Sequence, residues 1–348
     1  MRIAVDALGG DFGAEPNVTG AIRAVRNNPE LTVLLTGKEE VIRAELARLD
    51  LTGIKNRLEI IHAPDVIGMD DEPVSACREK PLSSLVRCAE LVKEKNADSF
   101  VSAGNSGAVM VAAFIKLGRL KGVSRPAIAA PIPTLKGYCL LLDAGANSEC
   151  KPQQLLEFAA MGIVYAKAVF GVADPTVGIL SMGEEECKGN SLVKDTIPLL
   201  KESGLNYKGP VEGRDIPEGT VDVVVCDGFT GNVVLKACEG LSKTLFTLIR
   251  EEVKSRPLSI AGMFLAQPAF KAIRDRTNPD NVGGAPLLGV AGNVIIAHGK
   301  SGPLAMYNAI NTAAMLARRN AGEEMKTVIA DIKSRQKNQT PEPENEII

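Results

Sequence analysis

The feature that most constrains the fold is a strand, a glycine turn and a helix in direct succession at residues 221–236, VDVVVCDGFTGNVVLK. The β-branched run at 221–226 predicts a strand buried on both faces. Apolar positions at helical spacing from Asn232 onward predict a helix. This order places free backbone N–H groups and a positive helix end at one spot, which suits an anion. The alternative is an ordinary strand-to-helix turn, because glycine turns are common.

The same order recurs along the chain. Six predicted strands end in small, polar, glycine-bearing turns, at residues 6–11, 104–107, 143–147, 183–190, 227–232 and 298–302. In open α/β sheets, ligands bind outside the carboxyl ends of the strands. We therefore expect the six turns to share one edge and to line a broad cleft. The alternative is that all six serve only as turns.

Strands and helices alternate throughout, which predicts an α/β class with a largely parallel sheet. A short link inside residues 127–147 predicts an antiparallel hairpin, so the sheet should be mixed. No composition break marks a linker, and we expect a single large domain over residues 1–336. The polar segment 65–81 predicts a mobile loop. The tail 337–348, rich in polar residues with Pro and Glu, predicts disorder.

The composition of the chain indicates which kinds of partner, metal and compartment to expect. The 348-residue chain has a net charge of −2 and no Trp, which gives no argument for nucleic acid. Seven cysteines without a C-x-x-C pair and only two histidines argue against a zinc site, and no metal or cofactor is expected. The odd cysteine count and a first strand starting at Arg2 indicate a reducing compartment without a signal peptide. No apolar run approaches the roughly 20 residues of a membrane span.

Named nucleotide motifs are missing. The stretch LGGDFG lacks the G-x-G-x-x-G spacing of dinucleotide-binding turns. The stretch HGKSG has the end of a phosphate loop, but Val294 stands five residues before Gly299 where that motif needs glycine. Neither ATP nor a dinucleotide is supported.

Nearly the whole chain resembles the PlsX family of bacterial phosphate acyltransferases. The resemblance rests on the stretches RIAVDALGGDFG, SAGNSGA, LLDAGAN, SMGEEECKGN, VDVVVCDGFTGNVVLK and GGAPLLGVAGNVIIAHGKS. Leu8 departs from the Met expected there, and both residues are apolar. The resemblance implies a homodimeric three-layer α/β/α fold similar to the isocitrate and isopropylmalate dehydrogenases. It also implies reversible conversion of fatty acyl-acyl carrier protein and inorganic phosphate into acyl-phosphate. The protein would be cytoplasmic and peripherally bound to the inner face of the cell membrane, beside a membrane glycerol-3-phosphate acyltransferase.

That chemistry can be assigned to residues. Phosphate is itself the nucleophile, so the site needs an anion cradle, oxyanion donors and a proton source for the thiolate. We expect Lys188 to bind phosphate or stabilise the transition state, the alternative being a surface lysine among three glutamates. Asn232 should donate to the thioester oxygen or cap a helix. His298 should protonate the thiol, contact phosphate or make a structural hydrogen bond. Asp227 and Asp143 should orient Lys188 or a water.

The remaining candidates form the cradle for phosphate and acyl group. These are Gly104, Asn105, Ser106, Gly107, Asn147, Gly189, Asn190, Gly228 and Gly231. Cys187 and Cys226 raise the idea of a covalent acyl-enzyme. We prefer direct attack of phosphate, because it needs no such step and free cysteines are usually buried.

Residues 251–276 combine an apolar centre with basic flanks, and Pro257 and Pro268 predict short broken helices. Such a segment suits an anionic membrane or an acidic carrier protein, and the alternative is a dimer interface or helix-pair core. The contact residues would be Leu258, Ile260, Met263, Phe264, Leu265 and Phe270.

Three other functions stay open. The first is a phosphotransacylase that uses coenzyme A. The second is a hydroxyacid dehydrogenase of related fold, which the missing dinucleotide signals disfavour. The third is a membrane scaffold without catalysis for lipid synthesis enzymes, which the polar strand ends disfavour.

Overall fold

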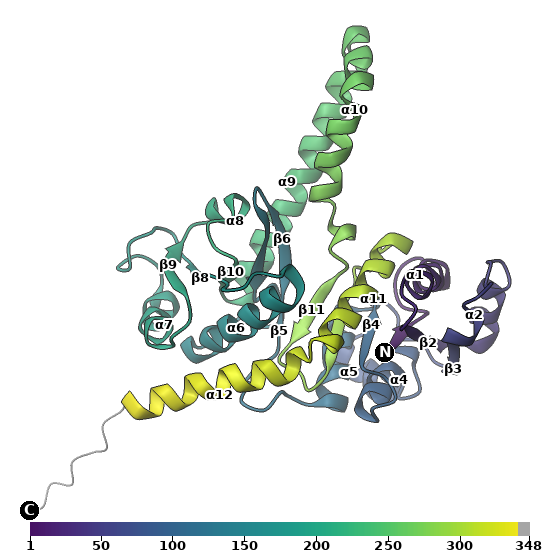
Figure 1. Ribbon diagram of the computed structural model, residues 1–348, viewed down its shortest axis with the longest axis horizontal. Helices are drawn as coiled ribbons and strands as arrows, with labels where there is room; N and C mark the ends of the chain where they lie inside the picture. Colours follow the sequence, from purple (N-terminus) through teal and green to yellow (C-terminus); the bar gives the residue numbers. More distant parts are fainter. Residues whose placement is uncertain (340–348) are drawn as a thin grey trace, which may run out of the picture.

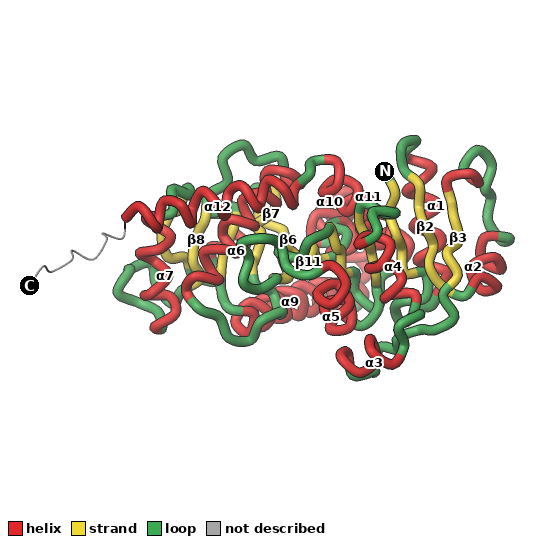
Figure 2. Tube along the Cα trace, turned by 90° about the horizontal axis from the view of Figure 1, so that it is seen from below, coloured by secondary structure: helices red, strands yellow, loops and turns green. Residues whose placement is uncertain are grey.

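Two β-sheets lie side by side in the computed structural model, which describes residues 1–339 (Figures 1 and 2). The first sheet has seven strands in the order β3-β2-β1-β4-β12-β11-β5. The second has five, in the order β6-β7-β10-β8-β9. The α/β class and the mixed, mostly parallel pairing are confirmed. The six glycine-bearing turns do not share one sheet edge, because three strands of each sheet carry them.

The seven-stranded sheet is parallel from β3 to β12 and antiparallel at β11 and β5. Its strands are β1 (Arg2–Asp6), β2 (Thr32–Gly37), β3 (Leu58–His62), β4 (Ser99–Ser102), β5 (Ala127–Ile128), β11 (Ala285–Leu288) and β12 (Asn293–Ile296). The central strands β1 and β4 are almost wholly buried, as expected for parallel strands that are covered on both faces.

The five-stranded sheet joins the predicted hairpin to three parallel strands. Its members are β6 (Ala130–Thr134), β7 (Gly137–Leu142), β8 (Val177–Leu180), β9 (Tyr207–Val211) and β10 (Val223–Val225). β6 and β7 pair antiparallel, which confirms the hairpin predicted from the short link. β10 lies between β7 and β8 and is buried along its length, as its β-branched run predicts.

Helices cover both faces of the first sheet, which gives three layers. Ile3 and Val5 of β1 belong to one core with α1 (Ala14–Asn27) and α11 (Pro303–Arg318). Ala4 between them belongs to another core with α4 (Ser84–Lys93) and α5 (Ser106–Leu117). Alternate residues of one strand therefore face opposite helical layers. Near this sheet, α2 spans Glu39–Leu46, η1 Lys55–Arg57 and η3 Pro279–Asn281.

The second sheet is covered in the same way. On one face lie α6 (Pro152–Tyr165), continued by η2 (Ala166–Phe170), and α7 (Ser191–Glu202). On the other lie α8 (Asp215–Glu218) and the start of α9 (Gly228–Lys254). The last helix, α12 (Ala321–Gln339), runs along α6, where Lys333 lies 3.1 Å from the buried carboxylate of Glu157.

α9 (Gly228–Lys254) and α10 (Pro257–Thr277) form a helical hairpin that projects from the body (Figure 1). The expected break at Pro268 is wrong, because α10 continues through it. An exposed helix tolerates this proline because its surroundings include water that can bond the freed carbonyl. Leu258, Phe264 and Leu265 are 90%, 75% and 81% exposed. Among residues 1–339, no helix combines the length and apolar character needed to cross a membrane.

Three further predictions concern the segment 65–81, the C-terminal tail and the extent of the domain. The segment 65–81 is not irregular throughout, because it contains the helix α3 (Pro73–Glu79), capped by the Glu72 carboxylate. Residues 340–348 of the expected tail lie outside the described part, and α12 extends to Gln339, past the expected boundary. The single domain over 1–336 stays a prediction.

Candidate functional site

Three polar turns meet at the carboxyl edge of the second sheet. β7, β10 and β8 are adjacent and parallel, so the turns at residues 143–147, 227–232 and 183–190 follow neighbouring strand ends. β1, β4 and β12 bring the turns 6–11, 104–107 and 298–302 together in the same way on the first sheet. The two sheets are joined beside these turns, since Asp143 Oδ1 accepts a 3.0 Å hydrogen bond from the N–H of Ile128 in β5.

Asp143 organises the turn that follows β7. Besides Ile128, its carboxylate accepts hydrogen bonds from the backbone N–H groups of Gly145, Ala146 and Asn147 and from Asn147 Nδ2. Burial raises the pKa of Asp143, and these hydrogen bonds counteract the rise. With its acceptor positions occupied in this way, Asp143 holds the turn together, and a role in orienting Lys188 or a water finds no support in these contacts.

Asp227 caps α9. This helix begins at Gly228, four residues before Asn232, where the sequence predicted its start. Its carboxylate accepts from Thr230 N at 2.8 Å and from Thr230 Oγ1 at 2.7 Å. The predicted capping role therefore belongs to Asp227, and for Asn232 it is wrong. Gly228 donates its N–H to Asn147 O at 2.8 Å. A Cβ on Gly231 would overlap the backbone oxygen of Asp143, so glycine is required for this close contact between turns.

Asn232 stands in the second turn of α9 with an exposed side chain that faces the neighbouring turn. A Cβ built on Gly145 would lie 3.6 Å from Asn232 Cβ. Within the described residues, no hydrogen bond to the Asn232 side chain is found. Its amide is therefore available to a ligand.

The other predicted asparagines are already engaged. Asn147 Nδ2 donates to Pro126 O and Asp143. Asn190 Oδ1 accepts from Val193 N as the cap of α7, while Asn190 Nδ2 has no partner within residues 1–339. Asn105 caps α5 and also donates to the carbonyls of Met69 and Asp71. A Cβ on Gly107 would meet Pro73, the first residue of α3, so the start of this helix and the residues before it cover the turn. Asn105 and Gly107 thus hold the covering segment in place, and Ser106 is exposed at the start of α5.

Lys188 projects from the turn between β8 and α7. Its ammonium lies 3.7 Å from Glu185, and its side chain is 51% exposed. The stem crosses Gly183, where a Cβ would lie 3.3 Å from Lys188 Cγ. An exposed ion pair of this kind is worth less than about 1 kcal/mol, so an incoming anion can displace Glu185.

Sequence reasoning misses Ser181, which sits directly beneath this turn. Its hydroxyl is buried and has no hydrogen-bond partner among the described residues. A Cβ on Gly189 would lie 3.1 Å from Ser181 Oγ. A serine just past a buried strand carries no distinguishing sequence pattern, so only the packing reveals it.

His298 lies at the end of β12 and is exposed. Its Nδ1 accepts a hydrogen bond from Lys300 N at 3.1 Å, which is the local structural bond expected as one alternative. In the neutral ring this places the proton on Nε2, so Nε2 can donate. Below the neighbouring turn, Asp6 is buried and accepts from Ser102 Oγ at 2.7 Å, and burial raises the pKa of Asp6.

The two cysteines near the turns differ in exposure. Cys226 is buried beneath α9, and burial raises the pKa of its thiol well above the ordinary range. A thiol kept protonated is a poor nucleophile, which agrees with the preference for direct attack. Cys187 is exposed, contrary to the expectation that free cysteines are buried.

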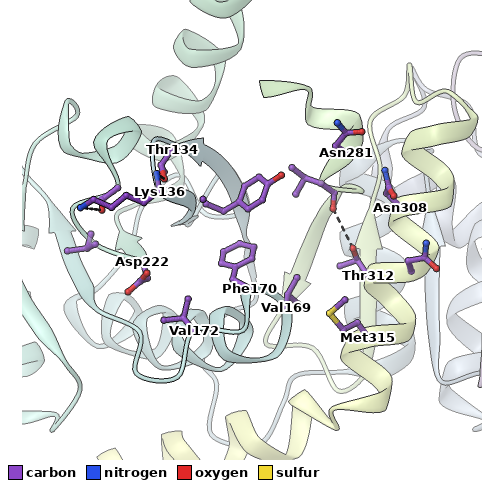
Figure 3. Close-up of a pocket in the computed structure, with 16 residues that line it drawn as sticks. Thr134, Lys136, Val169, Phe170, Val172, Asp222, Asn281, Asn308, Thr312 and Met315 are labelled. Atoms are coloured by element: carbon purple, nitrogen blue, oxygen red, sulfur yellow. Dashed lines mark hydrogen bonds between the residues drawn. The ribbon is translucent and has the colours of Figure 1, made fainter. Parts of the chain in front are cut away.

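A cavity of about 470 Å³ lies at the opposite end of the second sheet (Figure 3). It is bordered by Gly137 and Asp222, which stand at the starts of β7 and β10. Figure 3 shows Phe170 and Val169 on one side, with Asn308 and Thr312 of α11 across from them. The cavity is thus separate from the polar turns at the carboxyl ends.

Comparisons with known proteins agree with this architecture. The family model described as "Fatty acid synthesis protein" matches residues 1–324. A phosphate acyltransferase of Elusimicrobium minutum is 54% identical, covering 96% of this chain and 97% of that protein. A phosphate acyltransferase of Pelotomaculum thermopropionicum is 47% identical, covering 95% and 96%.

Solved structures share the fold at low identity. EutD phosphotransacetylase from Staphylococcus aureus has a TM-score of 0.60 and 18% identity, covering 91% of this chain and 94% of that one. A phosphotransacetylase from Streptococcus pyogenes has a TM-score of 0.62 and 17% identity, with the same coverage. The family match and the high identity confirm the resemblance seen in the sequence. The chain belongs to the fatty acid synthesis protein family and is an acyltransferase.

Proposed function

We propose that this protein transfers a fatty acyl group from the thioester of an acyl carrier protein to inorganic phosphate. A phosphate oxygen attacks the thioester carbonyl carbon, and the carbonyl oxygen becomes an oxyanion. The C–S bond then breaks, leaving acyl-phosphate and a thiolate that takes up a proton. The names of the similar proteins support transfer between acyl groups and phosphate.

The observation that carries the proposal is the Asn232 side chain, which is exposed at the edge where three strand ends meet and has no hydrogen-bond partner in the described part of the chain for either its oxygen or its nitrogen. Each of the other predicted asparagines uses its side chain in a cap or a turn. An amide N–H placed there can donate to the oxyanion as charge develops on it. Lys188, weakly paired with Glu185, supplies the cation for phosphate. The backbone at the half-buried Gly189 completes the cradle, whereas the N–H groups of Gly228 and Gly231 are already bonded to Asn147 O and Asp227 O.

His298 is proposed to donate a hydrogen bond to the leaving sulfur. Its Nδ1 accepts from Lys300 N, so the ring proton is on Nε2, and Nε2–H can donate to the developing thiolate. The thiolate takes its proton from the attacking hydrogen phosphate, because a neutral imidazole that gave up its remaining proton would become an imidazolate. No protein nucleophile is needed, because phosphate attacks directly. Asp227 contributes by fixing the start of α9, and so the position of Asn232, rather than by contacting the reacting atoms.

We also propose that the protein contacts a membrane surface, a second copy of itself and a further acyltransferase. The exposed apolar residues at the tip of the α9–α10 hairpin, among them Leu258 and Ile260, suit contact with an anionic membrane surface beside Lys254 and Arg256. Met263 and Phe270 are only half-buried against α9, which leaves a dimer contact open as a second use. We place the protein in the cytoplasm as a homodimer at the inner face of the membrane. There it would pass acyl-phosphate to a glycerol-3-phosphate acyltransferase.

A coenzyme A donor is the second candidate, because the structural neighbours are phosphotransacetylases. The test is to follow free thiol from palmitoyl-carrier protein and from palmitoyl-coenzyme A, each with and without phosphate. Phosphate-dependent release from the carrier protein alone is expected. Release from coenzyme A alone would favour the second candidate, and release from neither would refute both.

The Asn232→Ala variant tests the site in the same assay. Loss of one oxyanion donor is expected to lower kcat about 100-fold with little change in the KM for phosphate. Asn206→Ala is the matched control, since Asn206 bonds Asp174 at the start of β9, and it should retain the wild-type rate. Full activity in Asn232→Ala would remove this residue from the mechanism.

A further inference from the structure

The start of α9 presents large apolar side chains to solvent directly beside the free Asn232 amide. Phe229 is 67% exposed and Val233 is 53% exposed. Residues three and four apart share one face of a helix, so Phe229, Asn232, Val233 and Lys236 lie on the same side of α9. Burying a phenylalanine side chain away from water is favourable, and Phe229 does not make this gain in the chain without a ligand.

A third apolar side chain borders this face from the neighbouring strand. Met182 follows β8 and is 75% exposed. β8 and β10 are adjacent parallel strands with Ile179 opposite Val225, so the residues just past each strand end lie near one another. Met182 also immediately precedes Gly183, over which the Lys188 stem packs.

From this arrangement we propose that Phe229, Val233 and Met182 form the binding surface for the acyl chain, and so set the preference for long over short chains. The inference rests on the proposed function, in which the thioester carbonyl lies at Asn232. The methylenes next to that carbonyl then lie on Phe229 and Val233. Phosphate approaches from the side of Lys188.

The size of the surface favours this occupant over a protein or a membrane. Phe229, Val233 and Met182 fall far short of the ~800 Å² that each partner buries in a stable protein interface. The other large exposed apolar residues of α9 begin two turns further along the helix and are Leu241, Leu245 and Leu248. The surface also lies at the base of α9, beside the body of the protein, whereas the hairpin tip projects away from the body (Figure 1). An acyl chain matches both the apolar chemistry and the limited area.

The absence of tryptophan from the chain allows a direct test of binding. The Phe229→Trp variant carries a single indole at the proposed surface. Octanoyl-pantetheine, added without phosphate so that no transfer occurs, should shift its emission to the blue, and acetyl-pantetheine should not. Leu135→Trp, at an exposed position on the remote β6–β7 turn, should respond to neither. An unchanged Phe229→Trp spectrum, or equal responses from both sites, would overturn the proposal whether or not the protein is active.

Kinetics supply a second readout. In Phe229→Ala, kcat/KM for octanoyl- and palmitoyl-carrier protein should fall about fivefold to tenfold relative to acetyl-carrier protein. Phe229→Leu should recover most of this preference because it restores apolar area. An equal loss on all chain lengths would assign Phe229 to the structure of the turn and contradict the inference. Wild-type protein without phosphate-dependent thiol release would instead refute the proposed function, and the fluorescence result would still decide chain binding.

Discussion

Lys188 combines exposure, a weak ion pair and a position at a strand-end turn. Replacing it with alanine removes the side-chain cation that we assign to phosphate. We expect Lys188→Ala to lower kcat/KM for phosphate about 100-fold, comparable to losing one transition-state donor. Stability should change by less than about 0.5 kcal/mol, because the side chain is exposed.

The matched control for this variant is Lys201→Ala. Lys201 pairs with Glu186 at 2.7 Å and is also 51% exposed, but it stands near the far end of α7. Its rate should match the wild type. Equal losses in the two variants would show that general charge near this loop matters, and not the Lys188 ammonium.

For single residues, the sequence predicts where polar side chains gather better than it predicts the role of each side chain. The concentration of asparagine and glycine at strand ends was predictable because small polar residues mark turns. Which amide is free was not predictable, because it depends on partners distant in sequence, such as Pro126 for Asn147 and Met69 for Asn105. Asp227 illustrates the same limit, since helical periodicity locates the helix start only to within a few residues.

The contact between the start of α9 and the turn after β7 depends on glycine. A Cβ on Gly231 would overlap the Asp143 backbone, whereas a Cβ on Gly240 in the same helix would meet nothing within 4 Å. We therefore expect Gly231→Ala to destabilise the protein by about 2 kcal/mol or more and to lower activity by displacing Asn232. Urea unfolding and the thiol assay measure both effects.

Gly240→Ala serves as the control within α9. Alanine in an exposed helix interior is favoured over glycine by about 1 kcal/mol, so this variant should be more stable than the wild type and fully active. If Gly231→Ala were as stable and as active as the wild type, the two turns could separate without loss of stability, contrary to this prediction.

Elements with strong periodicity were predicted well. The buried β-branched strands and the β6–β7 hairpin follow from local sequence alone. The division into two sheets was not predictable in this way, because strand pairing is set by contacts distant in sequence, such as β12 beside β4. The helix through Pro268 escaped prediction because an exposed helix can lose one backbone hydrogen bond to water.

The α9–α10 hairpin projects from the body of the molecule (Figure 1), and Leu258, Phe264 and Leu265 on it are exposed. The double variant Phe264→Glu, Leu265→Glu should lower binding to anionic vesicles at least tenfold, since it replaces two exposed apolar side chains with charges. Vesicle sedimentation measures binding, and light scattering measures oligomer size.

Leu135→Glu is the control for the hairpin variant, because Leu135 is 77% exposed but lies at the base of the hairpin, where Arg276 donates to its carbonyl, and not near the tip. Its vesicle binding should equal that of the wild type. Unchanged vesicle binding with loss of the dimer in the double variant would assign these residues to a dimer contact and remove the membrane role.

The central claim is that phosphate itself accepts the acyl group at the edge defined by Asn232 and Lys188. The most direct measurement is to incubate the wild-type protein with palmitoyl-carrier protein and isotopically labelled phosphate, and to count labelled acyl-phosphate against free thiol. If phosphate is the acyl acceptor, the two products form in equal amounts and no thiol appears without phosphate. Thiol release without labelled acyl-phosphate would show that phosphate is not the acceptor.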